Sequence, residues 1–393
     1  MTTTFLNAPA VESSPPLDSR ERQNLRVLHV INGEHFAGAE RVQDLLAMRL
    51  PEFGFDVELA CLKPDAFDEA RKSTAVLHKV PMRSRFDLRP AWRLARLVRE
   101  RRCQLIHSHT PRAALVSALA GRIAGVPLVH HMHGQTATEM DRRLLGRINA
   151  AVEICSMRGA ARAIAVSATA RRYALELGYD ADRTCLVPNG VPAGAARAAV
   201  TNAADHWTIG SVALFRPRKG IETLLQAVAS LRAQKLPVVL RLIGRFETAQ
   251  YEHRLHNLAE QLEIAPYVQW VGFTSNVQAE LDQLDAMVLP SLLAEGMPMA
   301  VIEAMAAGVP VVASRVDGVV DVIDDEQTGL LCEPGDASAL SRQLARLVFG
   351  EVDANQLRDS ARRRHAESFS DHSMAAGVAE VYRQVLGPEV QQT

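Results

Sequence analysis

The sequence predicts an α/β protein with two doubly wound, Rossmann-like domains in tandem. Three observations support this prediction: alternation, length and one change in composition. Short apolar runs rich in β-branched residues alternate with helical patterns, which is typical of parallel sheets covered by helices on both faces. At 393 residues and 48% hydrophobic composition, the chain has enough apolar material for two cores. A turn-rich stretch at 191–206 interrupts the alternation once and predicts an interdomain linker.

The first predicted domain spans 25–190. It follows a tail at 1–24 that is rich in Pro, Ser and Thr and is expected to be disordered. Its predicted strands are 26–31, 56–61, 105–108, 128–131, 163–167 and 183–187. Its predicted helices begin after Gly38 and cover 92–101, 113–124 and 169–177.

The second predicted domain spans 207–372, where the alternation restarts. Its predicted strands are 207–214, 238–243, 268–271, 286–289 and 310–313, and its predicted helices are 220–233, 251–262, 299–307 and 338–349. The C-terminal segment 373–393 predicts one more helix, and its return to the first domain is one alternative. Ligands of open parallel sheets bind beyond the carboxyl ends of the strands, so two such domains predict a cleft between two substrates.

Composition excludes several classes of protein. The formal net charge of −1 gives no indication of nucleic-acid binding. The five cysteines are scattered and form no CxxC pair, which fits a reduced compartment and argues against a disulfide scaffold or a zinc ribbon. No run approaches about 18 uncharged apolar residues, and the tail lacks the apolar centre of a signal peptide. We therefore expect a cytoplasmic protein without a transmembrane helix.

The most informative stretch is 295–303 (EGMPMAVIE), which follows a predicted strand. Pro298 suits a first helical turn and Gly308 suits a left-handed cap, so a helix is predicted at 299–307. Glu295 and Glu303 therefore lie near a helix N-terminus, which attracts anions. A carboxylate there also accepts hydrogen bonds from hydroxyls, as a sugar beside a phosphate requires. The alternative is that Glu303 only stabilises the helix end electrostatically.

A basic turn at 216–220 (RPRKG) lies between a predicted strand and a predicted helix. Arginine binds phosphate through its planar fork and lysine as a point charge, so Arg216 and Lys219 are candidate phosphate ligands. In the second half of the chain only Lys219 and Lys235 are lysines, and Lys219 is the one at a strand-to-helix junction. An exposed basic turn without a ligand is the alternative.

The spacing of EGMP, of Glu303 eight residues after Glu295, and of AxAxGxPV resembles the signature of the family-4 glycosyltransferases of the GT-B fold. The similarity extends over the whole chain after the tail. It implies that Glu295 contacts the transferred sugar and that Glu303 binds the nucleotide ribose. It also implies that backbone amides near Gly296 and Pro298 meet sugar hydroxyls, with Gly296, Met297 and Pro298 in the donor-binding loop.

The resemblance assigns roles in the first domain too. The 38–40 loop, beginning with Gly38, is similar to the family's glycine loop, where the missing side chain lets backbone approach the donor diphosphate. His133, at the end of VHHMHG, matches a histidine near the donor sugar and the acceptor, and is favoured over His130 and His131. A metal site from these three histidines is the disfavoured alternative, because no Asp, Glu or Cys lies at ligand spacing.

One position departs from the family pattern. The family's usual arginine five residues before Lys219 is Leu214 here. In an extended chain Arg216 points to the same side as residue 214, so we expect it to act as the substitute. Contacts to the nucleotide are expected near Gly244 and in the 272–276 loop, which contains Thr274.

The resemblance implies a retaining hexosyltransferase with His133, Lys219 and Glu295 as catalytic residues. The donor would be a nucleoside diphosphate sugar, such as a UDP-sugar or GDP-sugar. The acceptor would be a glycan or a lipid-linked hydroxyl in cell-envelope or exopolysaccharide synthesis. No metal and no other cofactor is expected. Two alternatives remain: an epimerase-type enzyme of the same fold, and a non-catalytic nucleotide-sugar-binding protein.

The segment 83–102 carries many arginines interleaved with Trp92 and aliphatic residues. A basic amphipathic helix binds anionic membrane surfaces, which would place the protein peripherally on the inner face of a membrane. A solvated arginine face on an ordinary core helix is the simpler interpretation.

Overall fold

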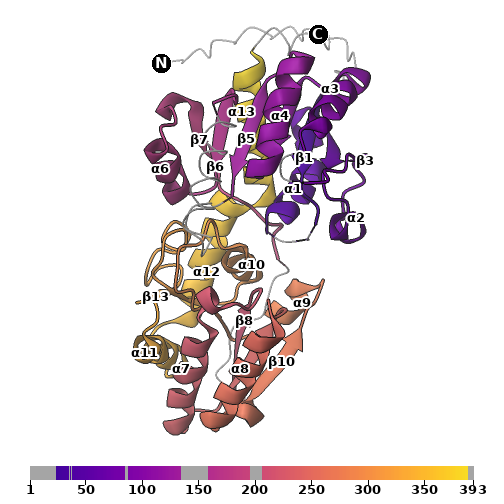
Figure 1. Ribbon diagram of the computed structural model, residues 1–393. Helices are drawn as coiled ribbons and strands as arrows, with labels where there is room; N and C mark the ends of the chain where they lie inside the picture. Colours follow the sequence, from indigo (N-terminus) through magenta and orange to yellow (C-terminus); the bar gives the residue numbers. More distant parts are fainter. Residues whose placement is uncertain are drawn as a thin grey trace, which may run out of the picture.

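A computed structural model describes residues 24–34, 36, 38–84, 87–133, 158–194 and 206–387. It contains two parallel sheets, each the centre of an α/β domain, as Figure 1 shows. Nearly all of the predicted tail, most of the predicted linker and the end of the predicted C-terminal segment lie outside these residues.

The first sheet has seven strands in the order β3-β2-β1-β4-β5-β6-β7, all parallel. The strands are β1 (Leu25–Ile31), β2 (Phe55–Cys61), β3 (Leu77–Lys79), β4 (Leu105–Ser108), β5 (Leu128–Met132), β6 (Arg162–Ala165) and β7 (Thr184–Leu186). Strand β1 is central, because it pairs with β2 on one side and β4 on the other. The last five residues of β1 and of β2 are all buried, as in parallel strands covered on both faces.

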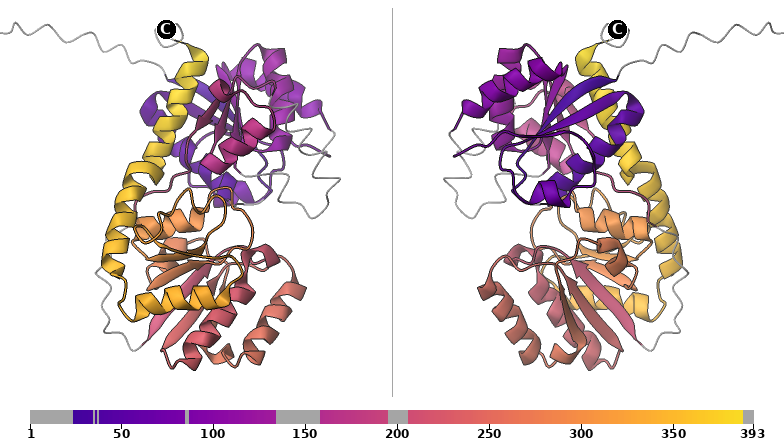
Figure 2. Two further views of the ribbon diagram at one scale, coloured as in Figure 1. Left: turned by 90° about the vertical axis from the view of Figure 1, so that its left-hand side faces the viewer. Right: turned by 90° about the vertical axis from the view of Figure 1, so that its right-hand side faces the viewer.

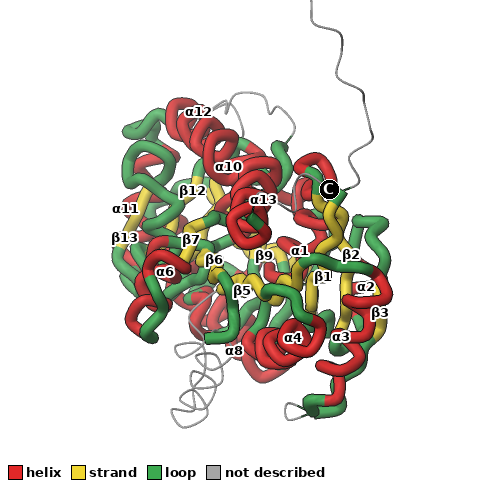
Figure 3. Tube along the Cα trace, turned by 90° about the horizontal axis from the view of Figure 1, so that it is seen from above, coloured by secondary structure: helices red, strands yellow, loops and turns green. Residues whose placement is uncertain are grey.

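Helices cover both faces of this sheet. The helices are α1 (Gly38–Arg49), α2 (Ala66–Ala70), α3 (Arg89–Arg101), α4 (Pro111–Ala124), α6 (Ala168–Glu176) and the C-terminal α13 (Asp371–Leu386). One apolar core joins α1 and α13 to the sheet, and a second core joins α3 and α4 to it. Figure 3, viewed from above, shows α13 and α4 on opposite sides of the strands.

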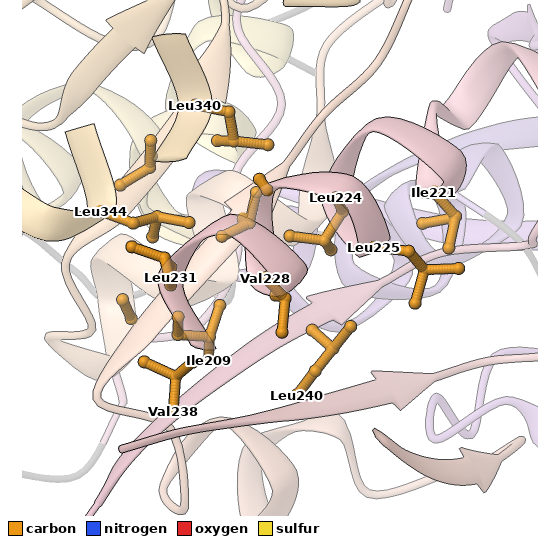
Figure 4. Close-up of a cluster of buried hydrophobic side chains, with 14 of the residues drawn as sticks. Ile209, Ile221, Leu224, Leu225, Val228, Leu231, Val238, Leu240, Leu340 and Leu344 are labelled. Atoms are coloured by element: carbon orange, nitrogen blue, oxygen red, sulfur yellow. The ribbon is translucent and has the colours of Figure 1, made fainter. Parts of the chain in front are cut away.

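The second sheet repeats the design with six parallel strands in the order β10-β9-β8-β11-β12-β13. The strands are β8 (Trp207–Val212), β9 (Val238–Ile243), β10 (Val268–Gly272), β11 (Ala286–Leu289), β12 (Val311–Ser314) and β13 (Leu330–Cys332). The helices are α7 (Ile221–Ala233), α8 (Ala249–Gln261), α9 (Val277–Leu281), α10 (Met299–Ala307), α11 (Ala337–Val348) and α12 (Ala354–Arg364). Figure 4 shows how Leu224, Val228 and Leu231 of α7 pack against this sheet.

Local sequence fixes where many helices begin. A side-chain oxygen before the helix accepts a hydrogen bond from a first-turn amide, which satisfies a group the helix leaves free. The residues that do so are Thr110, Ser167, Thr248, Asn276, Asp336, Asp353 and Ser370. Glycine in the left-handed conformation ends α4 at Gly125 and α10 at Gly308.

The chain crosses between the domains twice, and the two crossings lie side by side. The amide of Val191 donates to the carbonyl of Phe369 at 2.9 Å, and the amide of Asp371 donates back to Val191 at 3.0 Å. A Cβ on Gly190 would lie 2.0 Å from the carbonyl oxygen of Ser370, so only glycine allows this approach. After the second crossing α13 runs along the first domain, as the yellow helix in Figure 2 shows. At the start of α13, Asp371 Oδ2 forms an ion pair with Arg49 Nε of α1 at 2.7 Å.

The predicted α/β class and the arrangement of two parallel-sheet domains in tandem are confirmed. The sequence analysis missed the three-residue edge strands β3 and β13 and the helices α2, α9 and α12. Edge strands this short carry too few residues for an alternation pattern to be recognised. Pro298 precedes α10 rather than occupying its first turn. Within the described residues, no helix has the length and apolar character needed to cross a membrane.

The end of α13 generates a stability prediction. The hydroxyl of the fully buried Tyr382 bonds His29 Nε2 at 2.8 Å and His107 Nδ1 at 2.6 Å. Tyr382→Phe removes a partner from two buried rings and should lower the free energy of unfolding by about 1–3 kcal/mol. Urea denaturation followed by circular dichroism measures this. Tyr267→Phe, on a half-buried turn of the second domain, is the control, and an equal loss in both variants would contradict the assignment.

Candidate functional site

The two domains meet through loops that follow the carboxyl ends of their strands. A Cβ on Gly38, at the start of α1, would lie 3.5 Å from Met299 of α10 in the other domain. The amide of Asn189 lies 3.1 Å from the sulfur of Met297. These contacts bring the predicted glycine loop and the predicted donor helix to opposite sides of one interface, which is where open parallel sheets bind ligands.

Glu295 lies at the centre of a charged cluster in the loop after β11. Its Oε1 accepts hydrogen bonds from Lys219 Nζ and from Ser291 Oγ, each at 2.6 Å. Arg218 Nη2 lies 3.8 Å from the other carboxylate oxygen and donates to the carbonyl of Ala294 at 2.8 Å. The side chains of Lys219 and Glu295 are only 14% and 10% exposed, so this ion pair is shielded from solvent. Two cations around one carboxylate leave positive charge available to an anionic ligand.

Backbone contacts hold this cluster in place. The carbonyl of Arg218 accepts from the amide of Leu292 at 2.8 Å, which ties the basic turn to the loop of Glu295. Gly220 has φ +64°, and a Cβ there would lie 2.1 Å from the carbonyl oxygen of Pro290. Only glycine therefore lets Lys219 lie against the end of β11. The site is positioned by close packing of two loops and not by side chains alone.

The electrostatics of Glu295 follow from these neighbours. Burial by itself would raise the pKa of this carboxyl. The ammonium of Lys219 and the hydrogen bonds from Lys219 and Ser291 outweigh burial, so its pKa lies below the ordinary value. Glu295 is thus an anion at neutral pH and accepts hydrogen bonds.

Glu303 is buried on α10 and forms an ion pair with Arg41 of α1, across the domain interface. Burial raises the pKa of Glu303, and the attraction of Arg41 compensates only in part. Burial therefore makes the charged form of Glu303 unfavourable, and Arg41 is the cation that partly offsets this cost. A ligand with vicinal hydroxyls would supply the hydrogen bonds that such a buried carboxylate needs.

The N-terminus of α10 adds a further binding element. Pro298 provides no side-chain cap, and the amide of Val301 already donates to the carbonyl of Pro298 at 3.0 Å, so the amides of Met299 and Ala300 are the ones that a ligand could use. Gly296 and Met297 connect this terminus to Glu295, and the loop is fixed by the amide of Glu295 donating to the carbonyl of Asp317 at 2.8 Å. The structure thus brings Glu295, the helix terminus and Lys219 together, as the sequence motif suggested.

His133 directly follows β5 in the first domain. Its Nε2 lies 3.1 Å from His109 Nδ1, at the end of β4. Burial lowers the pKa of His133 to about 3, so the ring is neutral at physiological pH. His130 points elsewhere and bonds Ser108 at 3.0 Å, whereas His131 stacks on His133 with ring centroids 4.5 Å apart.

The structure does not bring Arg216 into the charged cluster. Its guanidinium lies 3.8 Å from Glu247, and Leu214 is 48% exposed. Arg218 is the guanidinium beside Glu295 instead. Whether Arg216 takes over the phosphate contact expected at residue 214 stays a prediction, since its ion pair with Glu247 is half-exposed and open to exchange.

Gly244 and Thr274 lie at the ends of β9 and β10. Gly244 adopts φ +145°, and a Cβ there would lie 1.8 Å from the carbonyl oxygen of Ala213. Its amide donates to the carbonyl of Gly272 at 2.8 Å, which joins the two strand ends. Thr274 Oγ1 accepts from the amide of Asn276 at 3.0 Å and begins the turn into α9. Both residues help form the strand-end edge expected to meet the nucleotide.

Sequence reasoning missed three participants: Arg41, Arg218 and Ser291. Arg218 and Ser291 lie inside the two motif segments and could have been found by asking which side chains share the Glu295 loop. Arg41 gave no such signal, because its partner Glu303 belongs to the other domain.

Comparison with known families accounts for almost all of the folded chain. Residues 36–194 match the family described as Glycosyltransferase Family 4. Residues 195–364 match the family described as Glycosyl transferases group 1. The boundary between the two matches falls at the first crossing between domains.

Curated relatives point the same way. The putative colanic acid biosynthesis glycosyltransferase WcaL of Escherichia coli (strain K12) is 33% identical over 154 residues, 37% of this chain and 37% of that protein. The chain thus matches well under half the length of this relative. The UDP-Gal:alpha-D-GlcNAc-diphosphoundecaprenol alpha-1,3-galactosyltransferase of Escherichia coli is 22% identical over 347 residues, 84% of this chain and 89% of that protein.

Among solved structures, Anabaena Alr3699/HepE in complex with UDP-glucose superposes with a TM-score of 0.80 at 21% identity. The superposition covers 92% of this chain and all of that chain. Identity at this level shows the shared fold.

The opposite electrostatics of the two carboxyls generate a pH prediction. The pKa of Glu303 is raised on folding, so its contribution to stability is largest below the unfolded pKa and is lost as pH rises through the folded pKa. The pKa of Glu295 is lowered, so its contribution is present above the unfolded pKa and is lost as pH falls through the folded pKa.

As the pH rises from 4 to 8, the melting temperature of Glu303→Gln should therefore increase relative to that of the wild type, and that of Glu295→Gln should decrease relative to it. This range includes the ordinary carboxyl pKa of about 4.3. Thermal unfolding of the three proteins in matched buffers measures both slopes. Each variant is the other's control, and slopes of the same sign would refute the electrostatic assignment.

Proposed function

Because the chain belongs to the family-4 glycosyltransferases, with the GT-B fold, we propose that it transfers a hexosyl group from a nucleoside diphosphate sugar to a hydroxyl acceptor. The observation that carries this proposal is the cluster of Lys219 and Arg218 around Glu295, next to the free N-terminus of α10. Cations and helix amides suit a diphosphate, and the carboxylate suits the hydroxyls of the attached sugar.

We propose a UDP-sugar as the donor to test first. The support is indirect: the solved relative named above binds UDP-glucose, and the galactosyltransferase relative is named for UDP-Gal. The same relatives suggest an acceptor in polysaccharide or cell-envelope synthesis, such as a glycan on a lipid diphosphate carrier.

In the proposed reaction the bond between the anomeric carbon and the diphosphate oxygen breaks, and a bond from the acceptor oxygen to that carbon forms. The acceptor's proton passes to the leaving diphosphate, and anomeric configuration is retained. Lys219 and Arg218 neutralise the charge that develops on the leaving group, so the transfer uses no metal or other cofactor. Glu303 holds the ribose and Glu295 holds the sugar.

His133 is proposed to orient the donor sugar and the acceptor from the first domain. Its ring is neutral because burial lowers its pKa to about 3, so it offers one donor and one acceptor nitrogen. Gly38 lets the opposite backbone approach the diphosphate. The interface contact between Gly38 and α10 supports a reaction that takes place between the domains, shielded from water.

An epimerase or a non-catalytic binding protein would bind the same donor, and product analysis separates the three. A transferase forms a glycoside only when the acceptor is present. An epimerase releases an altered sugar nucleotide or a free sugar without an acceptor, and a binding protein gives neither.

We further propose a peripheral contact with anionic membrane through α3. Its buried side is Ala91, Leu94 and Val98, whereas Trp92 is 58% exposed beside the exposed Arg93. A large exposed aromatic ring among arginines is unfavourable in water and favourable at a lipid headgroup surface. A lipid-linked acceptor would be within reach of an enzyme bound this way.

Lys219→Ala should reduce transfer by about 100-fold or more, because the leaving diphosphate loses a buried cation and Glu295 loses its closest partner. Release of the nucleotide from a screened UDP-sugar measures the rate. Lys235→Asn is the matched control: it removes the other lysine of this half at an exposed position whose left-handed φ of 62° asparagine tolerates. Wild-type turnover in Lys219→Ala would remove the residue from the mechanism.

The membrane proposal predicts co-sedimentation with phosphatidylglycerol vesicles at low salt. Binding should disappear near 1 M salt, where the screening length falls to about 3 Å. Trp92→Ser should weaken binding at low salt, whereas Phe349→Ser, which removes a ring that is 60% exposed on the second domain, should not. Equal binding to neutral vesicles, or equal effects of both substitutions, would dismiss α3 as the contact.

A further inference from the structure

Imidazole rings gather at the carboxyl end of the first sheet, and the proposed reaction uses one of them. They come from β1, β4 and β5 and from the residues that directly follow β4 and β5: His29, His107, His109, His131 and His133. Neighbouring rings are close, with centroids 4.2 Å apart for His107 and His109 and 4.5 Å for His131 and His133. Parallel pairing of β1, β4 and β5 places these side chains at one end of the sheet.

His131 is the member whose environment needs an explanation. Its side chain is fully buried, and within the described parts of the chain neither ring nitrogen has a hydrogen-bond partner. A neutral imidazole has one N–H donor and one acceptor nitrogen, and burying both unpaired costs about 1–3 kcal/mol for each group. His133 Nδ1 is likewise buried and unpaired. Buried polar atoms in native proteins normally have a partner, and here a water molecule or an ion would supply it.

Hydrogen bonds from neighbouring side chains hold His109 in the way that outer hydrogen-bond partners hold a metal ligand. His109 Nε2 lies 3.3 Å from His29 Nδ1, and His29 Nε2 lies 2.8 Å from the hydroxyl of Tyr382. If His109 donates through Nε2 to His29, its Nδ1 carries a lone pair toward His133 Nε2, 3.1 Å away. A hydrogen bond on the far nitrogen is the usual way in which a metal-binding histidine is oriented.

We propose that His109, His131 and His133 form a binding site for one divalent transition-metal ion, with Zn²⁺ as the best match. One nitrogen of each ring lies within 4.8 Å of the others. Two nitrogens bound at 2.0–2.1 Å in a tetrahedral site lie about 3.3 Å apart, which is close to the existing distance between His109 and His133. Rotation of the His131 ring would complete the set.

The chemistry of the donors selects the class of ion. Three imidazoles without a carboxylate suit Zn²⁺, Cu²⁺ or Ni²⁺ and not Mg²⁺ or Ca²⁺, which prefer oxygen ligands. Burial lowers the pKa of each of these rings, so they are neutral and carry the lone pairs that a metal needs. His133 is the partly exposed member, so the fourth position would be on its side of the cluster and hold an exchangeable oxygen ligand.

Occupation of this site would inhibit the proposed transfer, which needs no metal. A coordinated His133 loses its lone pair and the freedom to orient a sugar. Metal binding itself rests on the histidine geometry alone, so it stands or fails separately from the glycosyltransferase activity.

Calorimetry of the metal-free, full-length protein with Zn²⁺ is the primary test, and Co²⁺ provides a spectroscopic probe. We expect one ion per chain, and tetrahedral Co²⁺ absorption that Zn²⁺ abolishes. His131→Asn should weaken Zn²⁺ binding by at least about tenfold. His130→Asn is the matched control, because this neighbouring buried ring bonds Ser108 and lies outside the cluster.

Three outcomes would overturn the proposal. The first is no binding of Zn²⁺ or Co²⁺ by the wild type, which would leave buried water as the partner of His131. The second is equal loss of binding in His131→Asn and His130→Asn. The third is binding lost in His107→Asn but kept in His131→Asn, which would place the ion among His29, His107 and His109. If the variants fail to fold, the Co²⁺ spectrum of the wild type decides, since octahedral absorption contradicts the tetrahedral site proposed for these histidines.

Discussion

The return of α13 to the first domain is the constraint on which the rest of the structure depends. Its apolar side completes the core that also contains α1 and the central strands. The hydrophobic core of the first domain therefore depends on a helix from the C-terminal part of the chain. Both crossings are hydrogen-bonded to each other at Val191, so the chain passes between the domains at one place. On the other side of this crossing, the segment at 297–299 contacts Asn189 after β7 and Gly38 at the start of α1.

Close packing at two glycines positions the charged side chains of the site. Gly220 allows the basic turn to approach the end of β11, and Gly318 packs against the carbonyl of Glu295 at a distance that excludes a Cβ. These two contacts fix Lys219 and Glu295 from opposite sides. A buried ion pair gains little net stability, because desolvation offsets most of the attraction. Its position beside a free helix terminus is better explained by ligand binding than by stability.

Sequence was sufficient for the parts of the molecule that depend on local pattern. Long strands such as β1 and β9, and the α10 motif with its Gly308 cap, follow from periodicity and turn chemistry. The misses have physical causes. Strands β3 and β13 are short edges whose existence depends on a neighbour, and the pairing of Arg41 with Glu303 exists only once two domains dock. Arg218 was overlooked because alternation along an extended chain favoured Arg216, whereas the turn at 217–219 is a 3-10 helix that rotates the side chains.

The two carboxyls of the site differ in a way that connects domain docking to ligand binding. Glu295 has its cations within its own domain, so its charge is stabilised whether or not the domains touch. Glu303 depends on Arg41 from the other domain, and burial still raises its pKa. Any rotation that separates α1 from α10 leaves Glu303 without its cation, and a bound ribose would replace it with hydroxyl hydrogen bonds. Binding and domain opening therefore act on the same carboxylate, and a ligand that satisfies Glu303 lowers the cost of moving the two domains apart.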